Sequence, residues 1–122
     1  MRSDLPIVKY QQAAHHLMAQ AFEELAEGDT RQASEKGWGA AAQMLKAVAE
    51  HRGWEHKTHA DVYKVINKIV TETRQDQILD WGVIANDLHK NFYEDSSSPE
   101  FVAGGLRDIS KLIDHLEPLL ET

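Results

Sequence analysis

The sequence has 122 residues, a length typical of one domain with its own hydrophobic core. It contains no cysteine, which excludes disulfides, thiolate metal sites and cysteine nucleophiles. Its formal charge of −7, from 20 acidic and 13 basic residues, argues against a broad surface for polyanions but not against a small local basic patch.

The N-terminal residues, MRSDLPIVKY, carry charges and a proline where a signal peptide has its apolar stretch. No apolar run approaches the ~20 residues that span a bilayer. We therefore expect a complete, cytoplasmic protein without a membrane segment.

The hydrophobic pattern is helical throughout, and no alternating run bounded by hairpin turns indicates a strand. We predict a first helix that begins at residue 5 or 7 and ends at Glu27, before Gly28. Asp29 then caps a second helix, with Gln32 completing a capping box, and this helix extends to about His51. The short turn predicts an antiparallel hairpin of the first two helices.

Three further helices are expected along the rest of the chain. Thr58, Asp76 and Ser98 are their predicted N-caps, and Pro118 marks the end of the last one. Five helices joined by short connections predict an all-α, up-and-down bundle of about five antiparallel helices, forming one domain over residues 1–122.

Two glycines flank a tryptophan inside the second helix, where each glycine costs roughly 1 kcal/mol relative to alanine. Gly37, Ala40 and Ala41 share a face with almost no side-chain bulk, beside the core or interface anchor Trp38. One interpretation is that this face packs closely against the first helix or against a second copy of the chain. The other is that a ligand lies directly against its bare backbone. The same alternatives hold for Gly39, Gly82, Gly104 and Gly105.

Glu35 lies one helical turn before Trp38, near the core side, so its carboxylate needs a partner. That partner is either a group on another helix or the ligand of a site. Residues 51, 56 and 59 form a histidine cluster after the second helix, but Thr58 as a cap puts His56 outside the third helix. We therefore predict no metal site and no cofactor.

Arg52 and His59 have the residue types of a phosphate clamp and a general acid/base in metal-free RNA cleavage. A second polar stretch, LHKNFYED, places His89, Asn91 and Tyr93 at the end of the fourth helix. Up-and-down topology would bring the ends of the second and fourth helices to one end of the bundle. The two polar stretches are therefore predicted to meet in a pocket.

The segments GDTRQASEKGWGAAAQMLKAVAEHRGW and LHKNFYE, with the histidine pair between them, resemble the PaREP1-type helical proteins over about residues 14–116. These proteins are placed near the HEPN superfamily. The resemblance implies a five-helix, HEPN-like bundle, often dimeric. Many HEPN domains are RNases of toxin–antitoxin or defence systems with an R-x(4–6)-H motif near the end of a late helix. Others bind nucleotides or nucleotidyltransferases. Here LHKNFYEDSSSP contains no arginine, so no catalytic residue is transferred.

Three functions follow as hypotheses. The leading one is a non-catalytic binding module for a nucleotide, an RNA end or a partner protein. The second is a metal-independent RNase, with Arg52 as clamp and His59 or His89 as acid/base. The third is a structural dimerisation protein that uses the small-residue face of the second helix. We expect a homodimer or a nucleotidyltransferase-like partner. The predicted binding residues are Glu35, Trp38, Lys46, Arg52, His56, His59, His89, Asn91 and Tyr93.

Overall fold

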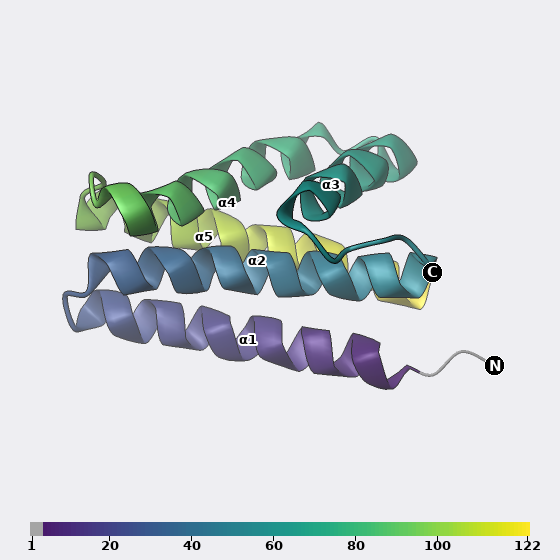
Figure 1. Cartoon of the computed structure of the whole chain (residues 1–122), viewed down its shortest axis with the longest axis horizontal. Coiled ribbons are helices and arrows are strands. Elements are labelled where there is room, and N and C mark those ends of the chain that lie inside the picture. The colour runs from purple at the N-terminus through teal and green to yellow at the C-terminus, as the bar shows by residue number, and fades with distance from the viewer. Residues whose placement is uncertain (1–3) are drawn as a thin grey trace.

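The computed structural model describes residues 4–122, which form five α-helices and a C-terminal 3-10 helix without any strand (Figure 1). The predicted all-α bundle of five helices is confirmed. The elements are α1 (Leu5–Ala26), α2 (Thr30–Arg52), α3 (His59–Thr73), α4 (Asp76–Glu94), α5 (Pro99–Leu116) and η1 (Glu117–Glu121). None of the helices in the described part of the chain has the length and apolar character needed to cross a bilayer.

Most helices begin and end where local chemistry predicts. The Asp29 carboxylate accepts the Gln32 backbone N–H at 3.1 Å, and Thr58 forms a reciprocal capping box with Asp61. Gly53 ends α2 with φ at 79°, a left-handed conformation that suits glycine. The predicted cap of α4 is wrong by one residue, because Gln75 is the N-cap and has no side-chain cap bond.

The small-residue face of α2 lies in the interior. A Cβ placed on Gly37 would lie 2.5 Å from Leu106 Cδ2 and 3.2 Å from Leu88 Cδ1, and Ala40 and Ala41 are fully buried. This face therefore packs against α4 and α5, because only residues without bulk let those helices approach. The predicted seam between two copies is wrong, since its residues are already covered.

The ends of α2 and α4 lie at opposite poles, so the predicted meeting of those two ends is wrong (Figure 1). Near the end of α4, the Phe92 carbonyl accepts a hydrogen bond from Arg31, at the start of α2. At the other pole, Arg52 donates to the Leu119 carbonyl near the C-terminus.

The connection over residues 53–58 explains the error. It turns back along α2, so that α3 begins beside the middle of α2 and runs obliquely toward the pole that α2 has just reached (Figure 1). α4 therefore starts on that side of the bundle, short of the end of α2, and runs antiparallel to α2 (Figure 1). The irregular connection, rather than a full-length helix, returns the chain from the pole to the middle of α2.

Candidate functional site

A cluster of aromatic and histidine rings lies where α2, α3 and α4 meet. The centroids of the His59 and His89 rings are 5.1 Å apart, with the ring planes at 85°. Trp38 lies beneath both, with its ring centroid 5.4 Å from His59 and 5.0 Å from His89. Tyr63 and Tyr93 complete this set, which we call the ring cluster: Trp38, His59, Tyr63, His89 and Tyr93.

Glu35 holds one of the two histidines in a defined orientation. Its Oε1 atom lies 3.1 Å from His89 Nδ1, and both side chains are half-buried. A carboxylate only accepts, so Nδ1–H is the donor, and Nε2 is left to exchange a proton or to bind a ligand. Glu35 thus has a partner on another helix, as its place beside the apolar face requires, and that partner belongs to the ring cluster.

The two tyrosines differ in exposure and in role. The Tyr63 hydroxyl donates to Asn86 Oδ1 at 2.7 Å, and burial raises the pKa of Tyr63. Tyr63 therefore stays a neutral donor at neutral pH. Tyr93 is 70 % exposed, and its ring centroid lies 5.5 Å from that of His89, so it offers a free aromatic face at the edge of the cluster. Tyr63 was missed from the sequence, although its position four residues after His59 puts both on one face of α3.

A pocket of about 360 Å³ adjoins the cluster, between α1, α2 and the first turn of α3. Trp38 and His59 line it, so it shares two residues with the ring cluster. The predicted binding residue Lys46 also lines it, together with Lys36 and Lys57, which the sequence did not single out as ligand contacts. We call this space the lysine pocket.

Arg52 and His56 lie away from the ring cluster. The Arg52 guanidinium donates two hydrogen bonds to the Glu72 carboxylate, at 3.0 and 2.8 Å, and one to the Leu119 carbonyl. His56 Nε2 lies 2.9 Å from Glu50 Oε2. The structure therefore does not bring Arg52 and His59 together, and Arg52 instead ties α3 and the C-terminal segment to the end of α2.

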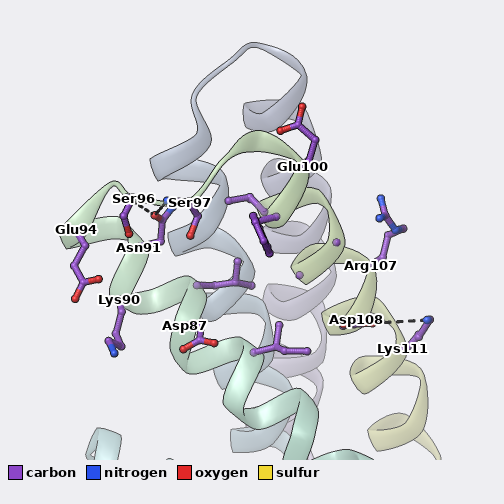
Figure 2. Close-up of a pocket in the computed structure, with 16 residues that line it drawn as sticks. Asp87, Lys90, Asn91, Glu94, Ser96, Ser97, Glu100, Arg107, Asp108 and Lys111 are labelled. Atoms are coloured by element: carbon purple, nitrogen blue, oxygen red, sulfur yellow. Dashed lines mark hydrogen bonds and ion pairs between the residues drawn. The ribbon is translucent and has the colours of Figure 1, made fainter.

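Asn91 is buried at 2 % exposure, and both its Nδ2 and its Oδ1 atoms form hydrogen bonds within the fold. Its Nδ2 donates to Ser34 Oγ at 2.7 Å, and its Oδ1 accepts from the backbone N–H groups of Ser96 and Ser97. Asn91 thus fixes the loop between α4 and α5, which borders a second groove of about 690 Å³ (Figure 2).

This α4–α5 groove has mixed charge. Its lining cations are Lys90, Arg107 and Lys111, and its lining anions are Asp87, Glu94, Glu100 and Asp108 (Figure 2). It therefore offers an anionic ligand no net attraction, in contrast to the lysine pocket. Across residues 4–122, no group of three histidine, cysteine, aspartate or glutamate side chains is arranged to hold a metal ion.

The fold recurs in the crystal structure of a protein from Sulfolobus solfataricus. That structure matches with a TM-score of 0.80 at 22% sequence identity, covering 88% of this chain and 96% of the other. No curated protein matches the chain. A family model described as the archaeal PaREP1/PaREP8 family matches residues 9–113.

Proposed function

The chain belongs to the archaeal PaREP1/PaREP8 family, and from its ring cluster we propose that it is a binding module for a nucleotide or an RNA end. One observation carries the proposal: two histidine rings 5.1 Å apart, one oriented by Glu35 and flanked by an exposed tyrosine. Imidazole N–H groups can bind phosphate or base edges, and the tyrosine face can stack on a base.

The exposure of Tyr93 supports this function. A solvated aromatic side chain gains little from folding, whereas a base stacked on one is worth about 1–3 kcal/mol. Trp38 is buried and contacts both histidine rings, and the partly buried Tyr63 packs against Trp38. The resemblance to PaREP1-type proteins, which are placed near the HEPN superfamily, agrees with the proposal, since some HEPN domains bind nucleotides. We include in the same proposal that the chain pairs as a homodimer or with a nucleotidyltransferase-like partner.

Fluorescence anisotropy with a short, labelled, single-stranded RNA tests the function. We expect Tyr93→Ala to weaken binding about 5- to 150-fold, the equivalent of one lost base stack, and Tyr93→Phe to retain it. Phe101→Ala is the matched control, because Phe101 is 79 % exposed on α5 and makes none of the ring contacts that define the cluster. Equal effects of Tyr93→Ala and Phe101→Ala, or no RNA binding by the unmodified protein, would refute the proposal.

The same geometry favours a second candidate function, metal-independent RNA cleavage. One imidazole would take the 2′-hydroxyl proton while the 2′-oxygen attacks phosphorus. The other would protonate the departing 5′-oxygen, leaving a 2′,3′-cyclic phosphate. The Glu35–His89 pair beside His59 is the specific observation in favour, because carboxylate-oriented imidazole is a general-base arrangement.

Cleavage assays in EDTA with mixed RNA separate the two functions. A cleaving enzyme would show a bell-shaped dependence of rate on pH and would lose activity in both His59→Ala and His89→Gln. RNA binding without cleavage would support the binding function and refute the cleavage function.

A further inference from the structure

Three lysines surround the pocket beside the ring cluster. Lys36 and Lys46 lie on α2, and Lys57 lies directly before the α3 N-cap. The other charged side chain of fixed sign that lines the pocket is Glu35, whose Oε1 is already engaged by His89. In a chain of net charge −7, this pocket therefore has a local surplus of positive charge.

Two of these lysines are available to a ligand. Within residues 4–122, the side-chain ammonium groups of Lys46 and Lys57 make neither a hydrogen bond nor an ion pair, whereas Lys36 Nζ is held 2.8 Å from Glu24 Oε1. An ammonium group carries three donors, so Lys36 can still contribute one to a ligand. Lys46 and Lys57 therefore offer the pocket ammonium donors that the fold itself does not use.

The backbone around the pocket adds to the attraction for an anion. Thr58 and His59, which line it, are the N-cap and first residue of α3, where N–H groups lack intrahelical acceptors and the helix dipole is positive. Asp61 offsets part of this field, since its carboxylate accepts from the Thr58 N–H at 3.2 Å. The lysines make the electrostatic potential of the pocket positive, and the N-terminus of α3 adds to it.

Another part of the pocket lining is apolar. Leu17, Trp38 and Val62 line it, and Gly39 leaves bare backbone where a Cβ would contact only Leu17 Cδ1, at 3.3 Å. A volume of about 360 Å³ exceeds that of a phosphate ion and falls in the range of small-molecule sites.

We propose that the lysine pocket is a phosphate site, in which Lys46 and Lys57 bind the dianion of a phosphate monoester or of free phosphate. This inference rests on the proposed function only for the source of the phosphate, which would be the terminal group of a bound nucleotide or RNA end. Phosphate binding itself can be measured independently of the ring cluster.

Isothermal titration calorimetry with inorganic phosphate, adenosine 5′-monophosphate and adenosine tests the site. We expect phosphate and the monophosphate to bind, and adenosine to bind at least about tenfold more weakly than the monophosphate. Lys46→Gln and Lys57→Gln should each weaken phosphate binding about tenfold or more, because each removes a charge-assisted hydrogen bond. Lys46→Arg should retain binding, and circular dichroism verifies that each variant folds.

Lys64→Gln is the matched control, because Lys64 is an exposed lysine on α3 that does not line the pocket. No binding of either phosphate compound, or an equal loss in Lys64→Gln, would overturn the phosphate site. Phosphate binding that survives Tyr93→Ala, in a protein that does not bind RNA, would support the phosphate site and refute only the proposed function. RNA binding without any phosphate binding would support the proposed function and refute only the phosphate site.

Discussion

Replacing Gly37 with alanine should destabilise the protein, although alanine is the better helix former. The new Cβ would lie 2.5 Å from Leu106 Cδ2 and 3.2 Å from Leu88 Cδ1, both on buried leucines. Leu106 is fully buried, so its methyl group has no free space to move into. Overpacking of a core costs about 1–3 kcal/mol, and the gain in helix propensity offsets about 1 kcal/mol. We therefore expect a net loss of about 1 kcal/mol.

Gly104 provides the same substitution without the collision. A Cβ there meets nothing nearer than Arg107 Nη2, at 3.7 Å, which is an ordinary contact. Gly104→Ala should therefore stabilise the protein by about 1 kcal/mol, since only helix propensity changes. Urea unfolding followed by circular dichroism measures the free energy of unfolding of both variants. The changes caused by the two substitutions should have opposite signs and differ by about 2 kcal/mol. If Gly37→Ala stabilised the protein as much as Gly104→Ala, close packing would not explain Gly37.

Two further predictions concern polar contacts. Asn91→Ala removes three hydrogen bonds of a side chain with 2 % exposure and should cost about 3 kcal/mol in urea unfolding. Ser34→Ala, which removes only one of those three, should cost about 1 kcal/mol. The hydrogen bonds from Arg52 lower the pKa of Glu72, so its contribution to stability is present at neutral pH and is lost as the pH falls below the ordinary range of a glutamate. Thermal unfolding between pH 7 and 3 should therefore show that stability falls less steeply with pH in Arg52→Gln than in the unmodified protein. An identical dependence of stability on pH in the two proteins would contradict this role of the ion pair.

The helices could be predicted from sequence because their limits depend on local chemistry. Asp29, Thr58 and Ser98 each accept a backbone N–H within the next three residues, which a short sequence window contains. Gly53 takes the left-handed conformation that ends α2. The cap of α4 is the exception, because Thr73 Oγ1 accepts the Gln75 N–H and so forms the turn before Asp76. That contact depends on where α3 ends.

The course of the connection after α2 could not be predicted in this way. A short irregular segment can continue past the pole or turn back, and local signals do not distinguish the two. Here the Trp54 N–H donates to the Ala49 carbonyl, His56 contacts Glu50 and the Tyr10 ring, and the Lys68 ammonium lies 5.4 Å from the Trp54 ring centroid. These are contacts with three different helices, so the direction of the segment is a property of the assembled bundle.

The same reversal explains why His59 and His89 meet even though the predicted common pole does not exist. Trp38 precedes the end of α2 by 14 residues, or about 21 Å of helix. A third helix that began at the pole would have left His59 that far from Trp38. Because the chain returns first, it delivers Lys57, Thr58 and His59 together to the middle of α2, opposite His89 of the antiparallel α4. The lysine pocket and the ring cluster are therefore neighbours because of this one connection, although their residues lie far apart in the sequence.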